Sequence, residues 1–361
     1  MLVPASTRQS PYRRALLRGA LGAVLLLTIG CGLPSAPIDG PPSDLPVAPL
    51  VKLGSGGSVY DAAVLLAARR GYFREQGLTV EIVSFPSLAA VLPPVVAGQL
   101  DAGTVPPSVD LFEALGHERA APRIVASAGQ AWPHFSPAAF LLRPDLAGLK
   151  PAQVRGRAIA VDLYGPAGYT FDLALARLGL HRRDVYVVDL PPERAAEALG
   201  ESQLDAAYVV EPEIAALVSE HRAVTWMSVG DLDPGQEMAL LLYSPNLAAH
   251  RRSIGTRLLS AYLRGQQDYR AALGSSAGRA ALRAELADAL GLDSPRSGEE
   301  LSLVLYPADG QPNLASLAAL EKHYARRHLL ERRVDFAQAI DPSFLRAAAQ
   351  RAAASVAPAG R

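Results

Sequence analysis

The sequence has little of several features that define common classes of protein. It holds one cysteine among 361 residues, which excludes a disulfide framework and a cysteine-based metal cluster. Basic and acidic residues are equal in number, at 35 each, so the chain lacks the basic excess of a nucleic-acid binder. The apolar run near the N-terminus, residues 20–29, is far shorter than the ~20 residues that a transmembrane helix needs. Half of the residues are apolar, which is ample for a large core and for two domains.

The first 49 residues predict export and attachment to a membrane. Several arginines precede the apolar run, and Gly30 stands directly before Cys31, so residues 1–30 are predicted to be a secretory signal. The sequence Leu-Thr-Ile-Gly-Cys at 27–31 resembles a bacterial lipoprotein box, which implies a lipid on Cys31. Residues 31–49 are rich in proline and predict a semi-extended tether of about 3 Å per residue. The general secretory and twin-arginine routes both remain open.

The stretch at 54–78 predicts the unit around which the rest of the chain is organised. An apolar strand at 50–53 leads into a Gly/Ser loop, which opens an amphipathic helix. Gly71 ends that helix, and Gly77 turns the chain into a second strand at 79–83. Strand, loop, helix and strand make a βαβ unit, with its loop at the carboxyl end of the strand, where open α/β sheets hold ligands.

The sequence at 67–80 carries a resemblance to a known family. Its pattern of small residues, Gly71-Tyr72-Phe73, then Gly77-Leu78 and a valine, resembles the N-terminal signature of a group of ABC-importer solute-binding proteins. That group carries nitrate, taurine, alkanesulfonates and the pyrimidine precursor of thiamine. Later segments also resemble this group. Residues 155–180 resemble its second-lobe pattern. Near the C-terminus, the Asp-Gly…Asn helix start at 309–313 and the Val-Asp…Asp-Pro-Ser-Phe sequence at 334–344 resemble its pyrimidine-binding branch. The resemblance spans nearly everything from 51 to 348.

The resemblance implies an α/β, two-lobed (type II) periplasmic binding protein fold. Each lobe would be a mostly parallel sheet flanked by helices, with the ligand cleft between the lobes. We expect lobe I at 50–138, lobe II with hinge strands at both ends at 139–243, and a helical completion of lobe I at 244–361. An internal echo supports two similar lobes, because Gln-Leu-Asp-Ala at 99–102 recurs at 203–206, each time before a short strand.

Four loops are expected to converge on the cleft: 55–60, 104–108, 164–169 and 208–213. They contain four tyrosines and no lysine or arginine. Two of the four tyrosines are expected to be structural. The predicted ligand-binding residues lie in these loops, with Trp132 added as a supplementary stacking face: Ser58, Tyr60, Pro106, Ser108, Trp132, Tyr164, Gly168, Tyr169, Tyr208 and Glu211.

The composition of the loops favours a flat aromatic heterocycle, of thiamine-precursor pyrimidine or flavin type, over a small oxyanion. Tyrosine faces suit a ring, whereas nitrate or a sulfonate calls for basic or hydroxyl donors and helix N-termini. Taurine, alkanesulfonates and nitrate remain the alternative. Glu211 resembles the glutamate of the pyrimidine binders that pairs with ring amino groups, and it could equally cap the helix that begins near Pro212.

No catalytic site, metal site or cofactor is predicted. A eukaryotic relative of this fold consumes its own histidine to make the thiamine pyrimidine, but the four loops hold no histidine. An enzyme making a pyrimidine precursor on the same fold is the alternative of another class. We predict that the protein is a monomer that binds a solute and is anchored by a lipid at the outer face of the membrane or in the periplasm. Its predicted partners are a small molecule and an ABC permease with its ATPase subunits, not nucleic acid.

Overall fold

The structure is a computed structural model that describes residues 48–116, 121–292 and 295–356. The predicted signal and lipidated cysteine lie outside the described residues, as does the tether except for its last two residues. None of the helices within the described ranges is long and apolar enough to cross a membrane.

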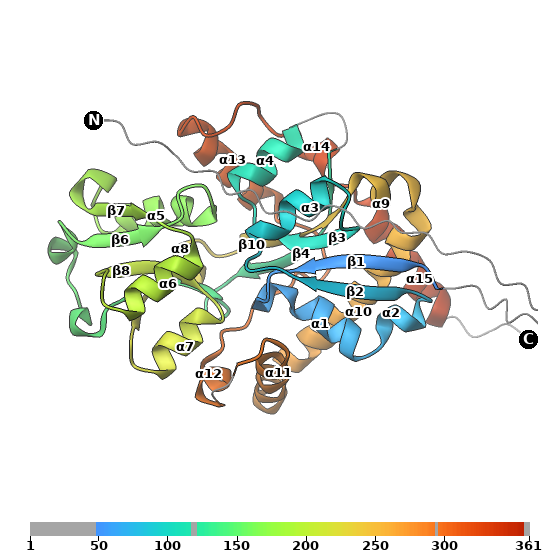
Figure 1. The fold of residues 1–361 in the computed structure, drawn as a ribbon, viewed down its shortest axis with the longest axis horizontal. Coiled ribbons are helices and arrows are strands. Elements are labelled where there is room, and N and C mark those ends of the chain that lie inside the picture. Colours follow the sequence, from blue (N-terminus) through green and yellow to red (C-terminus); the bar gives the residue numbers. More distant parts are fainter. Residues whose placement is uncertain (1–47, 117–120, 293–294, 357–361) are drawn as a thin grey trace, which may run out of the picture. The chain divides into compact units, whose positions relative to one another are not determined.

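Two five-stranded sheets organise the described residues (Figure 1). Sheet I has the order β2-β1-β3-β10-β4, and sheet II has the order β7-β6-β8-β5-β9. The strands of sheet I are β1 (Leu50–Ser55), β2 (Thr79–Ser84), β3 (Ala102–Val105), β4 (Arg123–Ala131) and β10 (Gln236–Tyr243). The strands of sheet II are β5 (Ala138–Leu142), β6 (Ala158–Val161), β7 (Tyr186–Asp189), β8 (Ala206–Val210) and β9 (Val224–Ser228).

The two sheets have the same spatial pattern of parallel and antiparallel strands. In each, three parallel strands (β2-β1-β3 and β7-β6-β8) are followed by an antiparallel strand and then an edge strand. The chain crosses between the sheets twice, from β4 to β5 and from β9 to β10. The predicted α/β fold class is confirmed.

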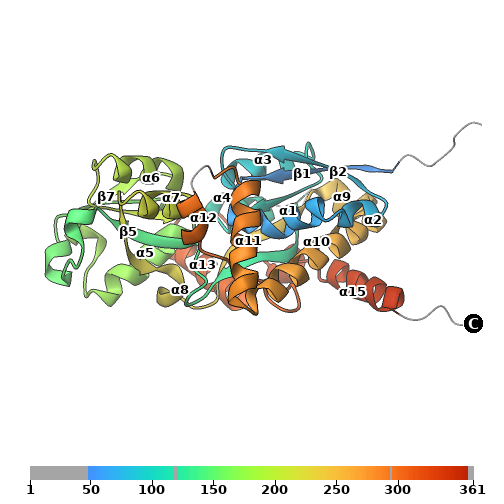
Figure 2. The ribbon, with the colours of Figure 1, turned by 90° about the horizontal axis from the view of Figure 1, so that it is seen from below.

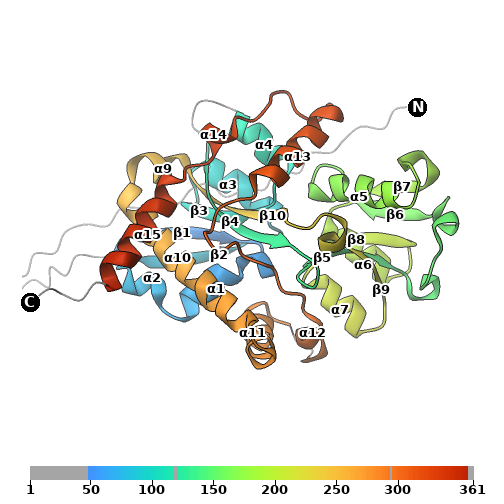
Figure 3. The same cartoon turned by 180° about the vertical axis from the view of Figure 1, so that it is seen from behind.

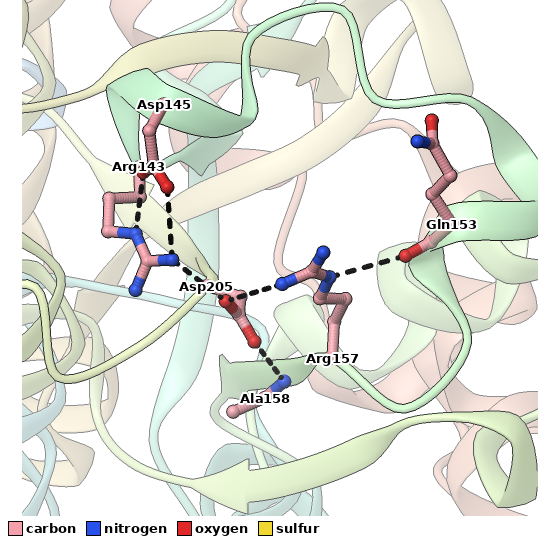
Figure 4. A network of polar contacts seen from close by, with 6 residues as sticks. All are labelled: Arg143, Asp145, Gln153, Arg157, Ala158 and Asp205. Atoms are coloured by element: carbon pink, nitrogen blue, oxygen red, sulfur yellow. Dashed lines mark hydrogen bonds and ion pairs between the residues drawn. The ribbon is translucent and has the colours of Figure 1, made fainter.

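The repeated Gln-Leu-Asp-Ala motif has the same structural role in both sheets. Asp205 exchanges hydrogen bonds with Ala158 at the start of β6, and its carboxylate also pairs with the guanidinium groups of Arg157 (3.3 Å) and Arg143 (3.5 Å; Figure 4). Asp101 does the same with Lys52 of β1. Its carboxylate accepts the Lys52 N–H at 3.0 Å and pairs with Arg251. The aspartate therefore fixes the register of the third strand against the first, and the expected duplication of architecture is confirmed.

Helices cover both sheets. The α-helices before β10 are α1 (Ala62–Arg69), α2 (Tyr72–Glu75), α3 (Leu92–Val96), α4 (Val109–Gly116), α5 (Pro166–Arg177), α6 (Pro192–Gly200), α7 (Glu213–Ser219) and α8 (Val229–Leu232). Those after β10 are α9 (Pro245–His250), α10 (Arg252–Leu273), α11 (Ser276–Ala289), α12 (Pro295–Glu300), α13 (Leu314–Arg326), α14 (Phe336–Ala339) and α15 (Ser343–Val356). Short 3-10 helices are η1 (Val59–Asp61), η2 (Ala89–Val91), η3 (Pro144–Leu146), η4 (Pro151–Val154) and η5 (Arg182–Asp184).

The long helix α10 packs closely on α1 and lies beside α15 (Figures 2 and 3). A Cβ atom at Gly265 of α10 would lie 2.3 Å from the carbonyl oxygen of Ala63, so only glycine permits this approach. The C-terminal helices thus return to sheet I, where α15 contacts β4 and α13 contacts β10.

One segment after α12 reaches from sheet I to the helices of sheet II. Leu305 pairs with Gln130 of β4 through two backbone hydrogen bonds, of 2.9 and 3.2 Å. A few residues earlier, α12 packs against α7 (Figure 3). A Cβ atom at Gly129, whose φ is +135°, would collide with Val304, so the crossing of this segment over β4 requires glycine there.

Candidate functional site

The candidate site is a cleft formed by loops of both sheets. Its empty space is about 820 Å³, including the part open to solvent. Sheet I contributes Gly56, Gly57, Ser58 and Tyr60 after β1, residues 86–89 after β2, Pro106 after β3, and Met238 within β10. Sheet II contributes residues after β6, β7 and β8. The six strands β1, β2, β3, β6, β7 and β8 form the parallel part of the two sheets, and their carboxyl ends supply all of the lining except Met238, as expected for open α/β sheets.

The glycine-rich loop after β1 folds over a buried carboxylate. The side chain of Asp61 accepts hydrogen bonds from the Ser55 hydroxyl (2.8 Å) and the Ser58 N–H (3.3 Å). Burial raises the pKa of Asp61 to about 6, and these hydrogen bonds oppose the rise. A Cβ atom at Gly56 would lie 2.4 Å from the backbone nitrogen of Leu88, so the space freed by this glycine is filled by the neighbouring loop.

Two tyrosines line the cleft from opposite sheets. Tyr60 and Tyr208 are each only 2% exposed, and neither hydroxyl has a hydrogen-bond partner among the described residues. The ring of Tyr208 packs edge-on against Phe140, with centroids 5.4 Å apart. Burial raises the pKa of both phenols, and the negative charge of Glu211 adds to the rise at Tyr60. Both hydroxyls are therefore neutral groups with hydrogen-bonding capacity unused in this structure.

Glu211 holds two parts of the chain together at the edge of the cleft. Its carboxylate accepts the N–H of Ala215 at 3.0 Å and the N–H of Ser302 at 2.8 Å. The residue is fully buried, and burial raises its pKa to about 7 despite the two hydrogen bonds. One carboxylate oxygen thus binds a backbone N–H in the first turn of α7, which agrees with the alternative that Glu211 caps this helix. The other oxygen binds Ser302, in the segment that crosses from sheet I.

Three further carboxylates come from consecutive loops of sheet II. Asp162 follows β6, Glu193 lies in the first turn of α6, and Glu213 begins α7. Burial raises the pKa of each, and repulsion by neighbouring carboxylates adds to the rise: Asp162 acts on Glu193, Glu193 acts on Glu213, and Asp189 and Asp110 act on Asp162. No lysine, arginine or histidine lines the cleft among the described residues.

Five of the ten predicted ligand-binding residues line this cleft: Ser58, Tyr60, Pro106, Tyr208 and Glu211. Ser58 also caps η1, because its hydroxyl accepts the Tyr60 N–H at 3.2 Å. The structure therefore brings together the predicted residues of three loops: those after β1, β3 and β8.

The other five predicted residues lie outside the lining. Ser108 accepts the N–H of Leu111 (3.3 Å) at the start of α4, and Gly168 is buried within α5. The Tyr164 ring is 53% exposed, and Trp132 donates its indole N–H to Gln130. Tyr169 packs edge-on against His323 of α13, at a centroid distance of 5.6 Å.

No sequence motif marked the loops after β2 and β7, which supply residues 86–89 and 191–193. A general signal was nevertheless present. Both segments follow predicted parallel strands, and every carboxyl end of a parallel sheet opens on the same edge. Applying that rule to all six strands would have found Glu193 and Ser87.

No group of three or more histidine, cysteine, aspartate or glutamate side chains in the described part of the chain could hold a metal ion. The arrangement can enclose a small molecule between two tyrosines, offer it several carboxylate oxygens, and surround it with the prolines of the loops.

The chain belongs to the NMT1-like family, whose model matches residues 46–287. The predicted family is thereby confirmed. No curated protein sequence matches the chain.

Solved structures share the fold at low sequence identity. The alkanesulfonate-binding protein SsuA from Xanthomonas axonopodis pv. citri, bound to MOPS, is 20% identical with a TM-score of 0.63, covering 81% of this chain and 98% of that chain. The periplasmic nitrate-binding protein NrtA from Synechocystis PCC 6803 is 16% identical with a TM-score of 0.69, covering 85% and 89%. A mutant of DszB in complex with biphenyl-2-sulfinic acid is 16% identical with a TM-score of 0.62, covering 84% and 100%.

Proposed function

We propose that this protein is the extracytoplasmic solute-binding component of an ABC importer. Family membership and the likeness to alkanesulfonate- and nitrate-binding proteins support a capture role. The mechanism we propose is that solute enters the cleft between the loops of sheets I and II, the lobes close around it, and the closed form docks on the permease. The proposed lobes are 50–138 with 244–361, and 139–243.

The proposed ligand is a small aromatic heterocycle, of thiamine-precursor pyrimidine or flavin type. The observation that carries this choice is the lining itself, which combines Tyr60 and Tyr208 with carboxylates and has no basic side chain among the described residues. Buried tyrosines give a ring apolar surface and hydroxyl groups together. A small oxyanion would meet Asp162, Glu193 and Glu213 without a compensating cation.

Taurine, an alkanesulfonate or nitrate is the second candidate ligand. This candidate is favoured because two structures similar to this chain are binding proteins for alkanesulfonate and for nitrate. An enzymatic role on the same fold is the remaining candidate, since the desulfurization enzyme DszB is also similar in structure. We propose binding without catalysis, because the cleft lining in the described part of the chain contains no cysteine and no serine–histidine pair that could act as nucleophile and base.

We further propose that Cys31 carries a lipid that anchors the protein at the outer face of the membrane or in the periplasm. The support is the sequence of 27–31 and the proline-rich composition of 31–49. Such a tether would let the binding domain reach a permease in the same membrane.

Native mass spectrometry of protein purified without refolding tests the capture role. We expect a retained small molecule, and calorimetric titration with pyrimidines, riboflavin, taurine, alkanesulfonates and nitrate then assigns its class. Binding of a heterocycle supports the proposed ligand. Tight binding of an oxyanion with no response to heterocycles would overturn the ligand while keeping the capture role, and no binding of any solute would overturn both.

A further inference from the structure

The cleft is electrically asymmetric. The sheet I side presents glycines, Ser58, Tyr60, residues 86–89, Pro106 and Met238, none of which carries a charge. The sheet II side presents the carboxylates of Asp162, Glu193 and Glu213, one from each loop that follows a parallel strand of sheet II. It also presents Glu211, whose carboxylate already accepts two backbone N–H groups. Among the described residues, no lysine, arginine or histidine forms an ion pair with Asp162, Glu193 or Glu213.

Part of this negative charge has a local structural role. Glu193 and Glu213 stand in the first turns of α6 and α7, where a carboxylate stabilises the helix dipole. Asp162 accepts the Tyr164 N–H at 2.9 Å. These same positions at helix N-termini are the ones that would otherwise bind an anionic ligand. The chain's own carboxylates therefore occupy the electropositive ends that an oxyanion needs.

A second observation is independent of the carboxylates. The hydroxyls of Tyr60 and Tyr208 line the same cleft, both residues are only 2% exposed, and neither hydroxyl has a partner among the described residues. Buried polar groups are normally paired, so two unpaired hydroxyls at one cavity indicate a polar group that is to arrive there. Besides burial, the negative charge of Asp162 raises the pKa of Tyr208, and that of Glu211 raises the pKa of Tyr60, so both phenols lie within the field of the carboxylates.

From this arrangement we propose that the cleft selects an organic cation with N–H donors, such as an amidinium, a primary ammonium or a protonated ring nitrogen. Its charged end lies against Asp162, Glu193 and Glu213, and its apolar body lies between Tyr60 and Tyr208. The proposal rests on the proposed capture function and narrows its ligand class. A cation there restores the charge balance that the cleft lacks, and its N–H groups find carboxylate and phenol oxygens as acceptors.

A series of small aromatic probes of similar size and different charge tests the proposal on the unmodified protein. The cations are benzamidinium and 4-aminopyridinium, the neutral probe is benzamide, and the anions are benzoate and benzenesulfonate. We expect calorimetry to show that at least one cation binds more tightly than benzamide by about tenfold or more, with no measurable binding of the anions. The affinity of the cation is expected to fall as salt is added, since the carboxylates are only partly buried.

Charge-removing variants locate the effect. Glu193→Gln and Glu213→Gln should each weaken binding of the cation by about fivefold, because each removes one carboxylate without changing its size. Glu220→Gln, at the opposite end of α7, is the matched control, since Glu220 is exposed and pairs with Arg222. Unfolding curves establish that each variant is folded.

Failure of both cations to bind more tightly than benzamide, tighter binding of an anion, or no binding of either cation would overturn the proposal. In the first two cases the capture role survives, because a solute still binds. The proposed capture function fails only if none of these probes binds and no small molecule is retained on purification. Failure of the cation proposal can therefore be distinguished from failure of the capture function.

Discussion

Glu211, at the carboxyl end of β8, accepts a hydrogen bond of 2.8 Å from the backbone N–H of Ser302, although 91 residues separate them in the chain. The other carboxylate oxygen accepts the N–H of Ala215 in α7. One buried side chain thus ties a helix of sheet II to the segment that pairs with β4 of sheet I.

Replacing this carboxylate should destabilise the fold. Glu211→Ala leaves one buried and one partly buried N–H group without an acceptor and should lower the free energy of unfolding by about 2–4 kcal/mol. Glu211→Gln keeps one acceptor oxygen and should lose about half as much. Urea unfolding followed by circular dichroism measures both. Unchanged stability together with abolished ligand binding would show instead that Glu211 recognises the ligand, which is the other role considered for it.

Two tyrosines predicted for the site should differ in their effect on binding. Tyr208→Ala should weaken ligand binding by about 1–3 kcal/mol, because its ring lines the cleft. Tyr164→Ala should change binding by less than about 0.5 kcal/mol, since its ring is 53% exposed and outside the lining. Tyr208→Phe is the control that keeps the ring and removes the hydroxyl. Calorimetric titration with the ligand retained on purification decides this. A large effect at Tyr164 would mean that its loop moves into the cleft on binding.

The loops show how far the sequence predicts the site. Tyr60 was predicted because its loop follows the first strand of a βαβ unit, and Glu211 because it resembles the glutamate of the pyrimidine binders. The positions of both loops follow from the order of strands. Whether a tyrosine points into the cleft depends on which side of a turn it occupies, so Tyr164 and Tyr208 could not be distinguished. Leu305 pairs with Gln130 across 175 residues, and no local pattern announces such a contact. The edge strand β9 was likewise not predicted.

A buried carboxyl group in sheet I should make stability depend on pH. Burial raises the pKa of Glu237 to about 7, and hydrogen bonds from Asn313, Ser127 and Gln130 oppose the rise. Between its ordinary pKa of 4.5 and about 7, the folded state holds a proton that the unfolded state has released. The free energy of unfolding should therefore fall by on the order of 3 kcal/mol as the pH rises through this window.

The variant Glu237→Gln isolates this contribution. As the pH rises from about 4.5 to about 7, wild type should lose stability relative to the variant. Comparing wild type with the variant cancels the contribution of His323. Burial lowers the pKa of His323 to about 4, so this residue makes stability rise with pH over part of the same range. The exposed Glu201→Gln change is the control, and its pH curve should parallel that of wild type. A Glu237→Gln curve parallel to wild type would contradict the prediction.

The lipid anchor predicts a change in location. Cys31→Ser removes the only thiol in the chain, so the mature protein should leave the membrane fraction and appear in the soluble extracytoplasmic fraction. Cell fractionation with immunoblotting measures this, and a wild-type sample treated in parallel is the control. Membrane retention of the variant would mean that another part of the chain holds it there.

The short bridge between Ser302 and Leu305 also makes one amide a natural reporter of movement. Ser302 is bound to Glu211 beside α7, and Leu305 is bound to Gln130 in β4, with only two residues between them. A chain of that length spans at most about 10 Å, so sheet II cannot swing far from sheet I unless one of the two anchors is released. If the hydrogen bond between Ser302 and Glu211 is the anchor that breaks, the exchange rate of the Ser302 amide hydrogen reports how often sheets I and II separate. A bound solute that holds the two sheets together should slow that exchange.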